Sequence, residues 1–162
     1  MKFSILRMPA AAFVATAFLA ASHCVFAQCS NATLHGRYAF TITGQILAPA
    51  PAAAFITGVA MTEYDGRGNF TQVDHVLDNG VPPQEEWRPG SGPYHVNRDC
   101  TGYMILTTRP TIPADATPEL RLEIVVSDNG NEIRTVVSGS PTVPGLAAAV
   151  TSTATRVYEF TW

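Results

Sequence analysis

The sequence has almost no lysine, few cysteines and no motif that declares a reaction. Lys2 is the only lysine among 162 residues. The chain lacks the G-x-S-x-G motif of a serine hydrolase, a phosphate-binding glycine cluster followed by a helical pattern, and histidines at a short metal-ligand spacing. We therefore expect neither a metal nor an organic cofactor, and no hydrolase of the serine type.

The first 27 residues have the pattern of a cleaved export signal. Lys2 and Arg7 supply positive charge, and an alanine-rich apolar stretch covers residues 10–21. Val25-Phe26-Ala27 places small residues before a cut at Gln28. The apolar stretch is shorter than the roughly 20 residues of a membrane-spanning helix, and the residues before the nearby cysteines are poor matches to a lipoprotein signal. The pattern predicts release into the periplasm or the medium.

Removal of the signal leaves residues 28–162, a length typical of one domain. The basic residues that remain are eight arginines against 13 acidic residues, a net charge of −5 with histidine taken as neutral. A chain without a basic stripe is not expected to bind nucleic acid. After cleavage we expect no membrane contact either. A small hydrophobic ligand and a homo-oligomer stay open as partners.

Two cysteines, Cys29 and Cys100, remain in the exported part of the chain. Two cysteines in an exported protein usually pair, and no C-x-x-C spacing indicates a redox-active site. A bond between them closes a loop of about 72 residues, which the chain-entropy model values at roughly 4 kcal/mol. We predict a structural disulfide.

The exported part alternates strand patterns with turn chemistry and has no helical pattern. Tyr38, Phe40 and Ile42 share one face of an alternating segment. Residues 65–69 and 128–131, D-G-R-G-N and D-N-G-N, supply the positive-φ residues of tight hairpins. The eight predicted strands cover 36–44, 55–64, 70–77, a part of 86–96, 100–108, 120–127, 132–138 and 151–162. An all-β chain of sequential strands forms a sandwich or a closed barrel, and we predict an antiparallel up-and-down β-barrel.

Several collinear motifs resemble a known family. Residues 29–40 read C-S-N-A-T-L-H-G-R-Y-A-F, close to the pattern C-S-N-A-T-L-x-G-x-Y-x-F. Further matches are Gly58-Val59, residues 64–69, 92–97, 99–102 and 128–134, and Thr155-Arg156. The chain resembles the allene oxide cyclase barrel-like domains, small exported calycin-type barrels of bacteria and fungi. The resemblance covers nearly all of the exported part. It implies an eight-stranded barrel, and related barrels include cyclases of oxylipins and polyketides.

Three features depart from the family pattern. Glu63 stands where an apolar residue is usual, Pro93 interrupts a Gly-x-Tyr strand, and the segment 110–118 is rich in proline. The first two bear on the register of the second and fourth strands. The matching motifs are turns, a cysteine and core positions, so the resemblance assigns no catalytic residue.

Polar groups that face the lumen are the natural candidates for chemistry, because a buried charge needs a partner or a task. Glu132 and Arg134 share one face of their strand. If Glu132 and Arg156 point inward, they pair and orient a ligand carbonyl or carboxylate; a structural salt bridge or a solvated outer face is the alternative. The candidate catalytic residues are Glu132 and Tyr103, and the candidate ligand-binding residues are Tyr38, Phe40, Arg134 and Arg156. Asp74 and His75 are adjacent, so alternation sends them to opposite faces.

Three functions are compatible with these patterns. The first is a binding module that holds a small apolar or amphipathic molecule. The second is a cyclase or isomerase acting on an oxylipin-like or polyketide-like substrate without a cofactor, and the third is an inert structural protein. A dry cavity without ionisable groups favours binding, and a buried carboxylate with a raised pKa beside a tyrosine favours catalysis. A lumen packed solid excludes both.

Overall fold

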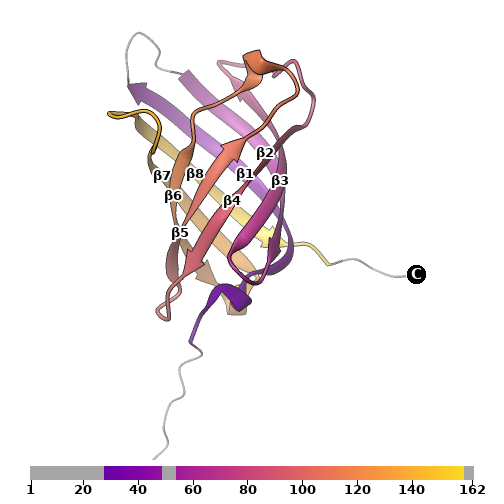
Figure 1. Cartoon of the computed structure of the whole chain (residues 1–162), viewed down its shortest axis with the longest axis vertical. Coiled ribbons are helices and arrows are strands. Elements are labelled where there is room, and N and C mark those ends of the chain that lie inside the picture. The colour runs from indigo at the N-terminus through magenta and orange to yellow at the C-terminus, as the bar shows by residue number, and fades with distance from the viewer. Residues whose placement is uncertain (1–27, 49–53, 159–162) are drawn as a thin grey trace, which may run out of the picture.

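The computed structural model describes residues 28–48 and 54–158, which form one closed barrel of eight antiparallel strands. Each strand is hydrogen-bonded to the next, and the last returns to pair with the first (Figure 1). The strands are β1 His35–Ala48, β2 Ala54–Asp65, β3 Asn69–Asp78, β4 Arg88–Val96, β5 Thr101–Thr108, β6 Leu120–Ser127, β7 Glu132–Gly139 and β8 Ala147–Arg156. Three short 3-10 helices accompany them: η1 Asn31–Thr33, η2 Pro113–Asp115 and η3 Asp128–Gly130. The predicted fold class is confirmed, whereas the predicted export signal, residues 1–27, lies outside the described residues.

Hairpin turns whose backbone needs positive φ define one end of the barrel. Between β2 and β3, Gly66 and Gly68 adopt φ of 73° and 117°. The Asp65 carboxylate accepts the N–H groups of the three residues that follow Gly66, at 2.7–3.0 Å. Between β6 and β7, residues 128–130 all have positive φ, which suits their sequence D-N-G. In the part of the chain that is described, no helix is long and apolar enough to cross a membrane.

Glu63 and Pro93, which depart from the motif pattern described above, do not disturb the strand register. β2 pairs with β3 without a shift, and Glu63 lies opposite Thr71. Pro93 pairs with Asn69, and β4 keeps one register with β5 on both sides of Pro93. Proline is tolerated here because the pairing with β5 skips Gly92 and Pro93, so the missing N–H falls at a break in that ladder.

The predicted end strand is placed too far along the chain. β8 spans Ala147–Arg156, while the prediction was 151–162, of which residues 159–162 lie outside the described part. Alanine is depleted in strands, so Ala147, Ala148 and Ala149 gave no strand signal. They pair with the far end of β1, which reaches Ala48.

In the half of the barrel near the β2–β3 and β6–β7 turns, which we call the closed end, large buried side chains pack against one another. Tyr64 is fully buried there and makes edge-to-face contacts with Tyr38 and Tyr94, at centroid distances of 5.3 and 5.0 Å. Helix η1 covers this end, since the Tyr94 hydroxyl lies 2.9 and 3.0 Å from the carbonyl oxygens of Asn31 and Leu34. Further buried side chains of this core are Phe70, Val96, Ile124, Val126, Ile133 and Ala154.

The disulfide lies at the closed end. Cys29 and Cys100 are bonded, with 5.0 Å between their Cα atoms. The bond joins the segment before η1 to the turn between β4 and β5. Both cysteines pack against the core, and Cys29 N–H also donates to the Arg98 carbonyl at 3.2 Å. The predicted pairing is confirmed.

Candidate functional site: a half-hollow lumen

The other half of the barrel, which we call the open end, holds a cavity of about 390 Å³. Its wall is mostly aliphatic. The inward positions there carry smaller side chains than the tyrosines of the closed end, which leaves room for the cavity. The apolar lining includes Phe40, Ile42, Ile46, Ile56, Val76, Leu106, Leu120, Leu122, Val137 and Val150. Side chains from all eight strands therefore surround the cavity.

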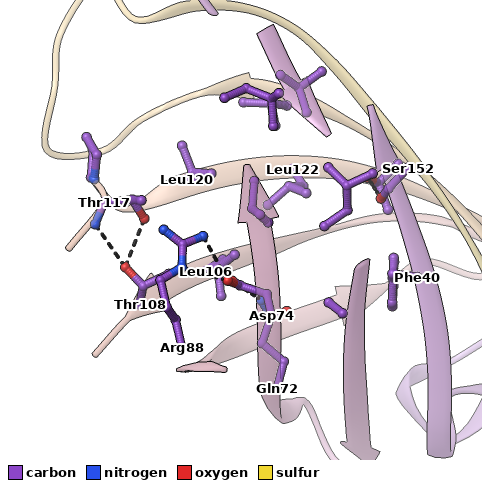
Figure 2. A pocket seen from close by; sticks show the side chains of 18 of the residues that line it. Phe40, Gln72, Asp74, Arg88, Leu106, Thr108, Thr117, Leu120, Leu122 and Ser152 are labelled. Carbon is purple, nitrogen blue, oxygen red and sulfur yellow. Dashed lines mark hydrogen bonds and ion pairs between the residues drawn. The ribbon is translucent and has the colours of Figure 1, made fainter. Parts of the chain in front are cut away.

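One side of this wall is polar (Figure 2). Asp74 on β3 and Arg88 on β4 are register partners whose side chains point toward each other inside the barrel. The Asp74 Oδ1 atom accepts from both Nε and Nη2 of Arg88, each at 2.8 Å. Both side chains are buried, with 3% of the Asp74 and 9% of the Arg88 side chain exposed. The pair is a desolvated, charge-assisted salt bridge on the cavity wall, in which two guanidinium N–H groups share one carboxylate oxygen.

Gln72 and Thr62 extend this polar wall toward the closed end. Gln72 Nε2 donates to Asp74 Oδ2 at 3.2 Å, and its Oε1 accepts from the Thr62 hydroxyl at 3.3 Å. Burial raises the pKa of the Asp74 carboxyl, while Arg88 and Gln72 act in the opposite direction. Every buried polar side-chain atom in the described ranges has a partner, so this network is satisfied internally.

The loop between β5 and β6 partly covers the cavity. Ala116, Thr117 and Pro118 line it. The Thr117 hydroxyl lies 2.8 Å from the Thr108 hydroxyl, and the Thr117 N–H donates to the same Thr108 oxygen at 3.1 Å. Arg88 Nη1 donates to the Asp115 carbonyl at 3.3 Å, which ties helix η2 to the salt bridge. The loop is therefore anchored on the polar wall.

Two of the predicted ligand-binding residues point inward, but only one reaches the cavity. Phe40 lines it. Tyr38 is buried in the closed-end core, where its hydroxyl donates to the Gly130 carbonyl and accepts from Arg156 Nε at 3.1 Å. Burial raises the pKa of Tyr38, and Arg156 acts against this. Arg156 also donates to the Thr33 carbonyl, so it supports the closed end and does not line the cavity.

The other predicted site residues lie on the outer surface of the barrel. Ile133, which alternates with Glu132 and Arg134, is the buried residue of this stretch of β7. Glu132 bonds Arg134 at 2.9–3.0 Å and the Ser127 hydroxyl at 3.0 Å, so the predicted pair of Glu132 with Arg156 does not form. Tyr103 alternates with the buried Gly102 and Met104, and the Arg121 guanidinium lies 4.4 Å from its ring centroid. For Glu132 the structure shows the alternative to an inward placement, a salt bridge with Arg134 on the outer surface.

The alternation of Asp74 and His75 is as predicted. Asp74 faces the lumen, and His75 lies on the outer side, with Nδ1 2.6 Å from the Glu86 carbonyl. Within the described ranges, no three histidine, cysteine, aspartate or glutamate side chains gather closely enough to hold a metal ion. The sequence carried a signal for the missed site, because an inward aspartate on β3 requires a buried partner. The sequence gives no matching signal for Arg88, because the start of the fourth strand is predicted only to lie within 86–96 and Arg88 is its first residue.

The fold and this cavity define a class of protein: an up-and-down β-barrel whose lumen is filled at one end and hollow at the other. Comparison of the chain with protein-family models, with curated protein sequences and with solved structures gave no match.

Proposed function

We propose that this chain is an exported barrel protein that binds one small apolar or amphipathic molecule in its lumen. The cavity of about 390 Å³ is the observation that carries the proposal. Small-molecule sites are typically concave, of roughly 300–1,000 Å³, and mostly apolar with a few placed polar groups. The wall described above has this composition. An eight-stranded barrel is also wide enough to hold one small ligand.

Export and family membership belong to the same proposal. The N-terminal pattern of residues 1–27 supports export, and the Cys29–Cys100 disulfide suits an oxidising compartment. The motifs shared with the allene oxide cyclase barrel-like domains support membership of that family. The strand number and topology of the barrel are those that such membership requires.

The sequence analysis gave one criterion for an inert filled barrel and one for catalysis, and the lumen meets each of them only in part. It is packed solid at the closed end and hollow at the open end, so an inert filled barrel is disfavoured. An ionisable carboxyl, that of Asp74, lies on the cavity wall. No tyrosine is among the described residues that line the cavity, and Asp74 is paired with Arg88. Binding is therefore the better supported function.

The test is a titration with N-phenyl-1-naphthylamine, a neutral dye whose fluorescence rises in apolar surroundings. We expect saturable binding to the wild-type protein. Val137→Phe places a ring in the cavity and should weaken binding by about tenfold or more, equal to about 1.4 kcal/mol. Val136→Phe is the matched control, because Val136 is the next residue of β7 and is 42% exposed on the outer surface. Equal binding by both variants would refute a ligand site in the lumen.

One observation favours the second candidate, a cyclase or isomerase. The Asp74 carboxyl is buried, its pKa is raised, and it lines the cavity. A carboxyl in such a place can transfer a proton to or from a bound substrate. Mass spectrometry of small molecules that co-purify from the native host, before and after incubation with fresh protein, tests this candidate. An isomeric product formed by the wild type and not by Asp74→Asn would support it.

A further inference from the structure

The ionisable groups on the cavity wall determine which ligands it accepts. Among the described residues that line it, only Asp74, Asp78 and Arg88 carry charge, and Asp78 is exposed at the end of β3. The formal sum is therefore −1 when both carboxyl groups are ionised. Arg88 is the one cation of this set that an anionic ligand could approach.

The charge of Arg88 is already compensated. Two of its nitrogen atoms donate to Asp74 Oδ1, and the third donates to the Asp115 carbonyl. With 9% of its side chain exposed, Arg88 has little water to replace these bonds. An anion in the cavity would either stay unpaired in apolar surroundings or compete with Asp74 for Arg88, and both are unfavourable.

A neutral polar group meets no such cost. An ionised carboxylate has about four lone-pair positions. Asp74 uses two of them at Oδ1 for Arg88 and one at Oδ2 for Gln72. The Gln72 amide is oriented by Thr62, so its Nε2 stays directed at Asp74. Oδ2 can accept one more hydrogen bond, from a hydroxyl or N–H group of a ligand.

On the basis of the proposed function, we propose that Asp74 makes the cavity selective for uncharged ligands, namely apolar molecules that carry a hydroxyl or N–H donor, and against carboxylates and sulfonates. The apolar body of such a ligand contacts the aliphatic wall formed by residues such as Ile42, Leu122 and Val137. Its donor reaches Asp74 on the opposite, polar side. Asp74 is thus a specificity-determining residue.

Two dyes of one scaffold test the proposal. N-phenyl-1-naphthylamine is neutral and has an N–H donor, and 8-anilinonaphthalene-1-sulfonate is the same scaffold with a sulfonate. Titrations are made at pH 8, and only the binding that Val137→Phe removes is counted as cavity binding. We expect the wild type to bind the neutral dye at least about tenfold more tightly, since an unpaired buried anion costs more than 1.4 kcal/mol.

Asp74→Asn should greatly reduce or abolish this preference, because it leaves Arg88 without its counter-charge. We expect affinity for the sulfonate dye to rise about tenfold or more, the effect of a newly available cation. Asp128→Asn removes the same charge at the closed end and should leave both affinities unchanged. Asp128 suits the exchange, because its φ of 49° is one that asparagine adopts readily.

The outcomes separate the two proposals. Equal cavity binding of both dyes by the wild type would overturn the selectivity and leave the binding function standing, and this comparison needs no folded Asp74 variant. A folded Asp74→Asn protein without a gain in sulfonate binding would overturn the role of Asp74. If neither dye binds in a manner sensitive to Val137→Phe, the binding function itself fails.

Discussion

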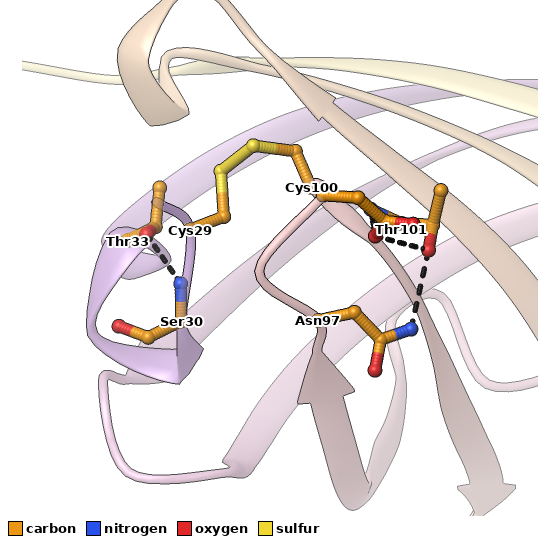
Figure 3. Close-up of a disulfide and its surroundings, with 7 residues drawn as sticks. Cys29, Ser30, Thr33, Asn97, Cys100 and Thr101 are labelled. Atoms are coloured by element: carbon orange, nitrogen blue, oxygen red, sulfur yellow. Dashed lines mark hydrogen bonds between the residues drawn. A yellow bond between two sulfur atoms is a disulfide. The ribbon is translucent and has the colours of Figure 1, made fainter. Parts of the chain in front are cut away.

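Loss of the disulfide should lower the stability of the barrel without changing what its cavity binds. Figure 3 shows the bond between Cys29, just before η1, and Cys100 in the turn that leads into β5. The perturbation is the double variant Cys29→Ser with Cys100→Ser. Reduction of the wild type with a phosphine is the control, because it breaks the same bond without changing the sequence.

The magnitude follows from the length of the closed loop. The cysteines are 71 positions apart, and cross-linking a loop of this length restricts the unfolded chain by about 4 kcal/mol at 25 °C in the chain-entropy model. For a domain of this size, 1 kcal/mol corresponds to about 3–4 °C in Tm. We therefore expect Tm to fall by about 10–15 °C in both the variant and the reduced protein.

The affinity of the cavity for the dye should stay unchanged in the variant and in the reduced protein, although both are less stable. Neither cysteine nor any residue of η1 lines the cavity, and the core around Tyr64 lies between the disulfide and the hollow half. Differential scanning calorimetry gives Tm, and titration with N-phenyl-1-naphthylamine well below Tm gives the Kd. We expect a Kd within about twofold of the wild type, less than about 0.5 kcal/mol. A stability loss below about 1 kcal/mol would refute the entropic reasoning, and a tenfold weaker Kd would refute the independence of the two halves.

Two further predictions concern charged groups outside the cavity. The N–H groups that bond Asp65 lower its pKa from 3.8 to about 2, so this carboxylate stabilises the fold above about pH 4 and loses that effect as the pH falls toward 2. Asp65→Asn should flatten the pH dependence of unfolding in this window, measured by urea denaturation at a series of pH values; an unchanged slope would contradict the assignment. Glu132→Gln should leave the Kd of the neutral dye within about twofold, because Glu132 pairs with Arg134 on the outer surface. A tenfold weaker Kd would contradict the placement of Glu132 on the outer surface.

The fold was predictable because turns and alternation are local properties. The D-G-R-G-N and D-N-G-N segments predicted two hairpin turns. Both turns are present, with positive φ at Gly66, Gly68 and residues 128–130. Alternation also predicted that Tyr38, Phe40 and Ile42 share one face, and all three belong to or pack against the buried core. Such signals depend on neighbours in the chain, so one sequence is enough to read them.

The direction in which β7 faces could also be predicted from its sequence. In E-I-R-T-V-V-S-G, Ile133, Thr135 and Val137 fall on one face, and the charged Glu132 and Arg134 fall on the other with Val136. The face with Ile133 is the inner one, and Ile133 lies opposite Val126 of β6 and Ala154 of β8. A lumen site at Glu132 and Arg134 required the other face to point inward.

The Asp74–Arg88 pair, in contrast, could not be predicted from local patterns in the sequence. The two residues are 14 positions apart and become neighbours only when β3 and β4 pair. The segment between them contains Pro82 and Pro83 and gives no sign of where β4 begins. A charged residue at the start of a strand is commonly exposed. Only closure of the barrel places Arg88 inside.

The division of the lumen into a filled and a hollow half follows from side-chain size along the barrel axis. An eight-stranded barrel is just wide enough for its side chains to fill it or for one small ligand. At the closed end three tyrosines and Phe70 occupy inward positions and pack into one buried core. At the open end the inward positions carry Ile42, Val137, Val150 and similar residues, so the same strand spacing leaves a cavity. The closed end and its disulfide can therefore maintain stability, while substitutions at the open end change the shape of the cavity without requiring a new fold.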